Sequence, residues 1–283
     1  EILRCLVGSE MCIRDSASIM TKAESLTELS EGYRALKEQG FTAAKIFVNG
    51  PVKTRNDGRD EFFSGRIEEE LEKVRVCREA VGSDFDFVLE AHRGMNVPEA
   101  ITFGNEVAKY RPMVFEDPIT PDNPDAMAEV AAKVPVPIAT GERFINLKEF
   151  ETVMARHGCQ YIRPDVCAVG GITTSKKICA LAEAHDVLVI PHNPLGPVST
   201  AACLQLCASI PNLGIQELPG FCLNGAEDAM VKEPLHFENG CLMIPDAPGI
   251  GVELSENAEE LYPANERGSN AAKRAFDGSV KDW

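Results

Sequence analysis

Residues 87–90 read FVLE, residues 113–116 read MVFE and residues 138–142 read IATGE. Each is a short apolar run of the kind that forms a buried strand, and each ends in a glutamate. Three more reactive side chains follow at a similar interval. The series has steps of 26, 26, 23, 27 and 25 residues and comprises Glu90, Glu116, Glu142, Asp165, His192 and Glu217. One strand, loop and helix of a TIM barrel has about that length. The spacing predicts a TIM-type α/β barrel that gathers all six side chains at one rim.

Strand and helix patterns alternate along the whole central part of the chain. Such alternation indicates a parallel sheet covered by helices, and the sequence has no GxGxxG motif to support an open nucleotide-binding sheet. We expect strands at 17–21, 43–48, 85–89, 113–115, 136–139, 161–162, 187–190 and 213–215. We expect helices over 26–39, over 67–81, from Pro98, from Asp125, over 147–157, over 174–184 and near Ala201.

The two ends of the chain and one loop depart from this alternation. Residues 6–16, LVGSEMCIRDS, resemble one reading frame of a sequencing-library adapter, so residues 1–16 are interpreted as a non-native segment; the alternative is an ordinary N-terminal extension. Residues 17–218 are assigned to the barrel, and residues 219–283 to a C-terminal tail packed on it. The stretch 48–66 is long for a loop between a strand and a helix, which predicts an active-site flap or a disordered insertion.

Composition limits the classes of partner. The chain has 283 residues, of which 44% are hydrophobic, enough for one large core. Its formal net charge of −16 argues against nucleic acid or an anionic membrane as a partner. The 10 cysteines include no CxxC pair, and no apolar run approaches the length of a membrane span. These features predict a reduced, cytoplasmic setting.

The residues at the rim predict metal-dependent chemistry. The carboxylates of Glu90, Glu116 and Glu142 would repel one another unless a cation lay between them, and oxygen ligands suit a magnesium ion. A solvated rim or pairing with arginine is the alternative. His192 and Asp165 follow neighbouring strands. A carboxylate that holds one imidazole nitrogen leaves the other available as a base near neutral pH.

Six motifs, in this order and spacing, resemble the sugar-acid dehydratases of the mandelate racemase group in the enolase superfamily. They are FVLEAHRG (87–94), MVFEDP (113–118), IATGERF (138–144), IRPDVCAVGGIT (162–173), IPHNPLGPVSTAACL (190–204) and IQE (215–217). The resemblance extends from Ala17 to Trp283 and includes the closing FDGSVKDW. It implies a (β/α)7β barrel preceded by an α+β capping domain. That domain is missing here, which we interpret as truncation near Ala17.

The resemblance also implies roles for the metal ligands and the base. Glu90, Glu116 and Glu142 match the three magnesium ligands on the third, fourth and fifth strands, although the family usually has aspartate at the first position. The extra methylene of Glu90 puts the geometry of the metal site in doubt. His192 and Asp165 match the pair that removes the proton from C2 of the substrate.

Three further residues match substrate-facing positions of the family. His92 resembles the general acid that protonates the departing C3 hydroxyl, and strand alternation would point it to the same face as Glu90; the alternative is a hydrogen bond to a ligand carboxylate. Lys45 matches the first lysine of a KxK pair whose second place is Phe47, which argues against two-base racemisation. Lys45 would bind the substrate carboxylate or simply be solvated. Glu217 matches a glutamate that binds the same end of the substrate and must be protonated or shared to do so.

The function that the resemblance implies is a Mg²⁺-dependent hydro-lyase. It would convert an aldonic acid such as galactonate to the 2-keto-3-deoxy acid through an enediolate, although the truncated chain is expected to have little activity. Dehydration of mannonate or gluconate is the alternative, and Asp165 favours the galactonate type. A non-catalytic sugar-acid-binding protein is the alternative from another class. The family also implies a homo-oligomer for the full-length protein.

Overall fold

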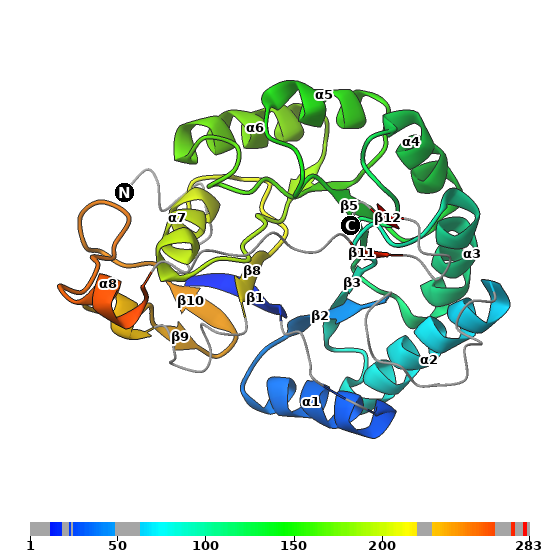
Figure 1. Ribbon diagram of the computed structural model, residues 1–283, viewed down its shortest axis with the longest axis horizontal. Helices are drawn as coiled ribbons and strands as arrows, with labels where there is room; N and C mark the ends of the chain where they lie inside the picture. Colours follow the sequence, from blue (N-terminus) through cyan, green and yellow to red (C-terminus); the bar gives the residue numbers. More distant parts are fainter. Residues whose placement is uncertain are drawn as a thin grey trace.

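The computed structural model describes residues 12–18, 23, 25–48, 63–219, 228–263, 273–274 and 280–281. Eight strands form a closed barrel, with the helices around it (Figure 1). Seven neighbouring strands pair in parallel from β1 to β7, β8 pairs in parallel with β1, and a bridge from Val189 to Leu213 closes the ring. The strands are β1 (Cys12–Ser18), β2 (Ala43–Phe47), β3 (Asp86–Glu90), β4 (Val114–Glu116), β5 (Ile138–Thr140), β6 (Tyr161–Ile162), β7 (Leu188–Val189) and β8 (Gln216–Pro219). The predicted (β/α)7β barrel is confirmed.

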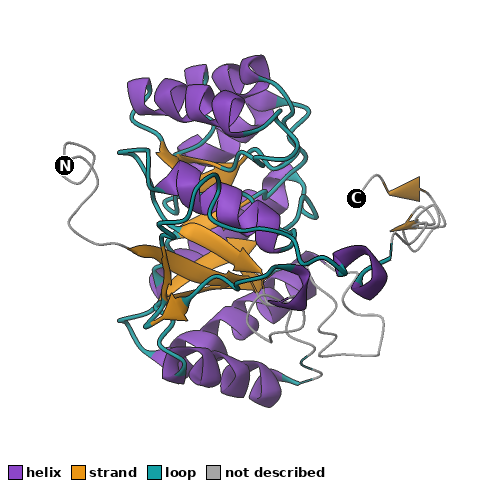
Figure 2. Ribbon diagram, turned by 90° about the vertical axis from the view of Figure 1, so that its left-hand side faces the viewer, coloured by secondary structure: helices purple, strands orange, loops and turns teal. Residues whose placement is uncertain are grey.

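Helices connect the successive strands and enclose them on the outside, as the side view in Figure 2 shows. They are α1 (Leu26–Glu38), α2 (Phe63–Val81), α3 (Val97–Val107), α4 (Pro124–Lys133), α5 (Leu147–Ala155), α6 (Ile172–Ala184) and α7 (Pro197–Cys207). Capping boxes begin two of them, with Asn96 and Glu99 at α3 and Asn146 and Glu149 at α5. These caps satisfy the free N–H groups of the first turn, so they define where each rim loop ends.

Other short elements lie outside the alternation. Strand β10 (Cys241–Met243) pairs antiparallel with β1, and β9 (Phe237–Glu238) pairs with β10. The Phe237 ring stacks on Phe41, with 4.5 Å between ring centroids, so this hairpin contacts the barrel. The remaining elements are η3 (Ala108–Tyr110), η5 (Asp228–Met230), α8 (Ala258–Leu261), β11 (Lys273–Arg274) and β12 (Val280–Lys281).

The strand period of two explains how the interior is layered. A buried apolar cluster formed by Ala43, Val88, Val114, Ala139, Ile190 and Ile215 is separate from the larger core beneath the helices. Two residues further along their strands, Lys45, Glu90 and Glu116 point to the same side as Ala43, Val88 and Val114. The apolar layer therefore forms a floor on which the polar residues of the mouth lie.

Two of the expected strands are misplaced. The first occupies Cys12–Ser18 rather than 17–21, and the eighth occupies Gln216–Pro219 rather than 213–215. The charges of Arg14 and Asp15 interrupt the apolar pattern by which the first strand would be recognised in the sequence. In the structure Arg14 pairs with Asp86 at 2.6 Å.

The interpretation of residues 1–16 as an adapter stays a prediction. Of the expected flap, residues 49–62 lie outside the described residues, and residues 63–66 belong to α2. Within the described residues, no helix is long and apolar enough to cross a membrane.

Asp15 is a buried acid that pairs with no cation in the part of the chain that the structure describes. It is 0% exposed and faces β10, where Oδ2 accepts a hydrogen bond of 2.8 Å from the Leu242 N–H. Its Oδ1 and both side-chain polar atoms of Gln216, its neighbour on β8, have no hydrogen-bond partner among the described residues. Burial raises the pKa of Asp15 well above the usual value, against the effect of the Leu242 N–H.

We expect Asp15→Asn to stabilise the protein by about 1–3 kcal/mol at pH 7, because the amide keeps the acceptor for Leu242 and cannot ionise, whereas the buried acid must be protonated or buried as a charge. The folded chain holds the Asp15 proton more tightly than the unfolded chain, so this acid costs stability as pH rises above about 4. Thermal unfolding at pH 4 and pH 7 measures the effect, with the exposed Asp122→Asn as control. A gain that did not increase with pH would contradict this account.

Candidate active site

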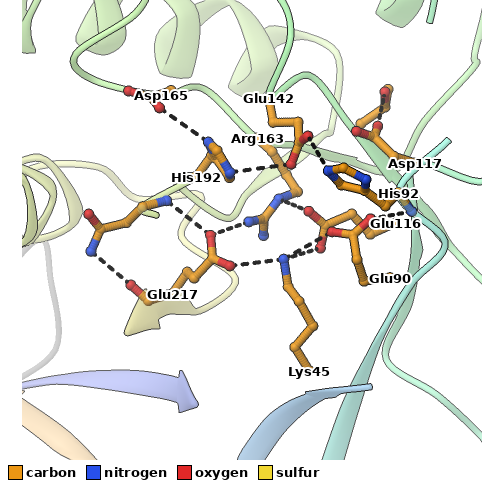
Figure 3. Close-up of polar contacts among 12 residues, drawn as sticks. Lys45, Glu90, His92, Glu116, Asp117, Glu142, Arg163, Asp165, His192 and Glu217 are labelled. Atoms are coloured by element: carbon orange, nitrogen blue, oxygen red, sulfur yellow. Dashed lines mark hydrogen bonds and ion pairs between the residues drawn. The ribbon is translucent and has the colours of Figure 1, made fainter. Parts of the chain in front are cut away.

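Lys45 occupies the centre of the barrel mouth (Figure 3). It lies on β2, is only 4% exposed, and its Nζ lies 3.1 Å from Glu90 Oε2, 3.0 Å from Glu116 Oε2 and 2.9 Å from Glu217 Oε1. These glutamates come from β3, β4 and β8. The alternative of a solvated lysine is therefore wrong. The carboxylates outweigh the effect of burial and hold the pKa of Lys45 above its usual range, so the side chain is a cation.

Arg163 is a second buried cation, and sequence reasoning missed it. It is 1% exposed; its Nε lies 2.5 Å from Glu116 Oε1, and its Nη2 forms a close ion pair with Glu217 Oε2. The backbone N–H of Asn193 also donates to Glu217 Oε2 at 2.9 Å. Arg163 precedes Asp165 by two residues in the motif IRPD. Strand alternation from Asp165 was the signal that could have placed Arg163 inside the barrel.

A third cation, Arg93, connects the ends of β4 and β5. Its Nη1 lies 3.2 Å from Asp117 Oδ2 and forms a close ion pair with Glu142 Oε1. Thr140 donates a hydrogen bond of 2.6 Å to Asp117 Oδ1. None of Arg93, Asp117 and Thr140 was singled out in the sequence, although each adjoins a motif residue. These contacts hold the loop after β3 against the loops after β4 and β5.

His92 reaches the mouth by a different route from the one expected. Strand β3 ends at Glu90, and His92 has a left-handed φ of 48°, so strand alternation does not set its direction. Its side chain is 46% exposed, with Nε2 at 3.9 Å from Glu142 Oε1. Arg93 Nη2 lies 2.7 Å from the same nitrogen, which must accept because a guanidinium can only donate. The backbone N–H of His92 donates to Glu90 Oε1 at 2.6 Å.

His192 and Asp165 lie side by side at the ends of β7 and β6. A parallel bridge joins their backbones, and His192 Nδ1 lies 3.2 Å from Asp165 Oδ2. Asp165 Oδ1 accepts hydrogen bonds from the N–H groups of Cys167 and Ala168 at 2.8 and 3.1 Å. Partial burial acts to raise the pKa of Asp165, but His192 and these N–H groups outweigh it and lower the pKa. The other ring nitrogen, Nε2, lies 3.3 Å from Glu142 Oε2.

Glu90, Glu116 and Glu142 each offer one oxygen within 4.8 Å of those of the other two. Ligands placed 2.0–2.6 Å from one ion have about this separation. In the ion-paired cluster, five acidic side chains (Glu90, Glu116, Asp117, Glu142 and Glu217) face three cations (Lys45, Arg93 and Arg163), so the acids outnumber the cations by two. The separation of the oxygens and the larger number of acids both fit one divalent ion.

The pKa values of these acids depend first on burial and then on the neighbouring charges. Burial raises the pKa of Glu116 to about 8 despite Arg163, and burial together with the Glu142 carboxylate raises that of Asp117 to about 7. Glu217 behaves differently. Burial acts to raise its pKa, but Arg163 and Lys45 hold the pKa of Glu217 well below the usual range. Glu217 is therefore a shared, ionised carboxylate rather than a protonated one.

Two open hollows adjoin Arg93. One, of about 410 Å³, is lined by Arg143, Phe144 and Lys148 among others, and the other, of about 460 Å³, by Met95 and Ile119 among others. Arg93 lines both hollows, and the same side chain pairs with Glu142 of the carboxylate cluster.

The fold and the site together define a class: (β/α)7β barrels whose mouth combines a carboxylate triad able to hold a metal with an aspartate–histidine pair. Residues 28–258 match the family model described as Enolase C-terminal domain-like, and the chain belongs to this family of the enolase superfamily.

Relatives agree with this assignment. The chain is 32% identical over 265 residues to D-galactonate dehydratase of Cronobacter sakazakii, covering 90% of this chain and 67% of the relative. It is 32% identical over 259 residues to D-galactonate dehydratase of Xanthomonas oryzae pv. oryzae, covering 89% and 65%. The chain thus spans about two thirds of the length of these relatives. The resemblance to sugar-acid dehydratases is confirmed.

Solved structures show the same barrel. A putative mandelate racemase/muconate lactonizing enzyme from Burkholderia SAR-1 superposes with a TM-score of 0.85 at 30% identity, covering 95% of this chain and 68% of the other. A putative mandelate racemase/muconate lactonizing enzyme from Labrenzia alexandrii DFL-11 superposes with a TM-score of 0.83 at 28% identity, covering 93% and 69%.

Proposed function

We propose that the protein is a Mg²⁺-dependent dehydratase that converts an aldonic acid of the galactonate type to its 2-keto-3-deoxy acid. The observation that carries this proposal is the contact of 3.3 Å between His192 Nε2 and Glu142 Oε2. It places the aspartate-held imidazole directly beside the triad that fits a divalent ion. The D-galactonate dehydratases among the relatives support the substrate class.

The first step is removal of the C2 proton. His192 Nε2 takes this proton while Asp165 holds Nδ1, and the electron pair of the C–H bond moves into an enediolate of the substrate carboxylate. A magnesium ion held by Glu90, Glu116 and Glu142 would supply positive charge beside the carboxylate as negative charge develops there. Lys45, which Glu217 holds, offers a second positive charge to the same end of the substrate.

The second step is loss of the C3 hydroxyl. The enediolate electrons form the C2–C3 double bond as the C3–O bond breaks, and His92 donates the proton with which the hydroxyl leaves as water. The resulting enol becomes the 2-keto-3-deoxy acid. For this role the His92 nitrogen that faces the hydroxyl must carry a proton, so Arg93 must release Nε2 or the ring must donate through Nδ1. Glu217, held by Arg163 and Asn193, positions Lys45.

The test is an assay with Mg²⁺ and a panel of aldonic acids that includes galactonate, gluconate and mannonate. The assay follows formation of the 2-keto acid and exchange of the C2 proton in deuterated water. Galactonate is expected to give the fastest exchange of the panel. If mannonate or gluconate were turned over fastest instead, that acid would replace galactonate as the proposed substrate. Tight binding of a sugar acid without exchange would indicate a binding protein instead of an enzyme.

We propose a reducing, cytoplasmic setting for this activity. Among the described residues, six cysteines are free thiols, and five of these are buried: Cys77, Cys159, Cys179, Cys203 and Cys207.

A further inference from the structure

Every oxygen of Glu90 and Glu116 that could face an ion already has a partner. Glu90 Oε1 accepts from the His92 N–H and Glu116 Oε1 lies against Arg163, while Lys45 Nζ holds Oε2 of both glutamates. A divalent ion at the triad would have to share these oxygens with their neighbours, and the cations among those neighbours would oppose it electrostatically. The neighbour that moves away when the ion binds therefore determines the binding mechanism.

Lys45 is the partner that can leave. The His92 donor is a backbone N–H in a turn, and the Arg163 guanidinium is held at the same time by Glu217. Lys45 ends a flexible four-carbon stem, and Glu217 gives its ammonium a third carboxylate to keep. An ammonium and a divalent ion on the same two oxygens would also repel each other strongly at this depth.

We propose that Lys45 is the resident counter-ion of the triad and that a divalent ion binds only when Lys45 releases Glu90 and Glu116 and keeps Glu217. The ion and the ammonium therefore compete for the same oxygens. Once released, the ammonium is free to meet the carboxylate of a substrate, so metal binds before sugar acid. This inference rests on the metal site of the proposed function.

The test measures Mn²⁺ binding by calorimetry, without any sugar acid. Lys45→Met is expected to bind Mn²⁺ at least about tenfold more tightly than the unaltered chain, because the ion no longer has to break buried ion pairs. Lys45→Arg, which retains the charge in a forked shape able to hold both glutamates, is expected to bind Mn²⁺ no more tightly than the unaltered chain. The matched control is Lys73→Met, which removes a buried lysine on α2 that pairs with Glu70 at 3.0 Å outside the site. That control is expected to leave Mn²⁺ affinity unchanged.

Thermal unfolding adds a second measurement. Lys45→Met leaves Glu90 with one fewer cation, so in the absence of metal the variant should melt at a lower temperature than the unaltered chain. Mn²⁺ should raise the melting temperature of the variant by more than it raises that of the unaltered chain. Equal or weaker Mn²⁺ binding by Lys45→Met would overturn the inference. If that variant does not fold even with Mn²⁺, tighter binding by Lys45→Arg would overturn it.

The experiment separates this inference from the proposed function. If Lys45→Met binds Mn²⁺ and the unaltered chain does not, the result supports competition between Lys45 and the ion. If neither the variant nor the unaltered chain binds Mn²⁺, both this competition and the proposed metal site are wrong. Competition without turnover of any sugar acid would leave the Lys45 inference supported and the dehydratase proposal wrong.

Discussion

Replacing His192 by asparagine lowers the rate of C2-proton exchange with deuterated solvent by about 10²–10⁴-fold, the usual contribution of a positioned general base. Asparagine retains a hydrogen bond toward Asp165 but has no basic nitrogen for the substrate. Because His192 is not among the residues expected to bind the ion, Mn²⁺ affinity should stay within about twofold, which is well under 1 kcal/mol. Proton NMR of galactonate in deuterated water measures the exchange.

The control for this variant is His236→Asn, since the His236 side chain is 69% exposed and lies near Glu238 at 3.4 Å, outside the barrel mouth. It should exchange the C2 proton at the unaltered rate. Unchanged exchange by His192→Asn would remove the mechanism proposed above. In His92→Asn, loss of water should slow while exchange of the C2 proton persists. That result would show that His92 acts as the acid in a step separate from the one in which His192 acts as the base.

Replacing Arg163 by methionine destabilises the protein by about 3–5 kcal/mol, the usual effect of removing one partner from a buried ion pair. Arg163 contacts both Glu116 and Glu217, each nearly inaccessible to solvent, so its loss leaves two buried carboxylates with Lys45 as their shared cation. Urea unfolding at pH 7 in the absence of divalent ions measures the loss. Arg163→Lys should lose less stability than Arg163→Met, because lysine keeps the positive charge.

The control for the stability measurement is Arg156→Met. The Arg156 pair with Asp125 has a comparable distance of 2.6 Å, but both side chains are exposed, so its removal should change stability by about 0–1 kcal/mol. If Arg163→Met lost no more stability than Arg156→Met, the buried cluster would not be the stabilising network described here. Added Mn²⁺ should partly restore Arg163→Met, because the ion neutralises the triad that includes Glu116.

Much of the fold and of the rim could be predicted from the sequence because the signals are local. Apolar runs followed by helical patterns give the order of strands and helices, and a strand end is recognisable by its last reactive residue. Glu90 and Glu116 end β3 and β4, and Asp165, His192 and Glu217 lie in or just after β6, β7 and β8. A closed parallel barrel places such positions on one rim whatever the intervening loops. Their roles in catalysis and metal binding stay predictions.

The boundaries of β1 and β8 depended on contacts between distant segments. Asp15 and Ser16 pair in register with Gln216 and Glu217, about two hundred residues away, and that pairing rather than local apolar character defines both strands. Contacts between distant segments also explain how His92 reaches the mouth. Its left-handed backbone belongs to a turn that Arg93 ties to Asp117 and Glu142, and strand periodicity does not extend into a turn.

The sequence by itself determined which side chains stand at the strand ends, because a period of two residues and a repeat of one βα unit are properties of the chain alone. Only the tertiary structure decided what surrounds them. Lys45 was recognised only by its match to a KxK pair, and Arg163 was not recognised at all. Ring closure places both between carboxylates of different strands, where burial makes each charge dependent on its neighbours. Charge balance at the mouth is a property of the closed ring, so no single segment of the chain could reveal it.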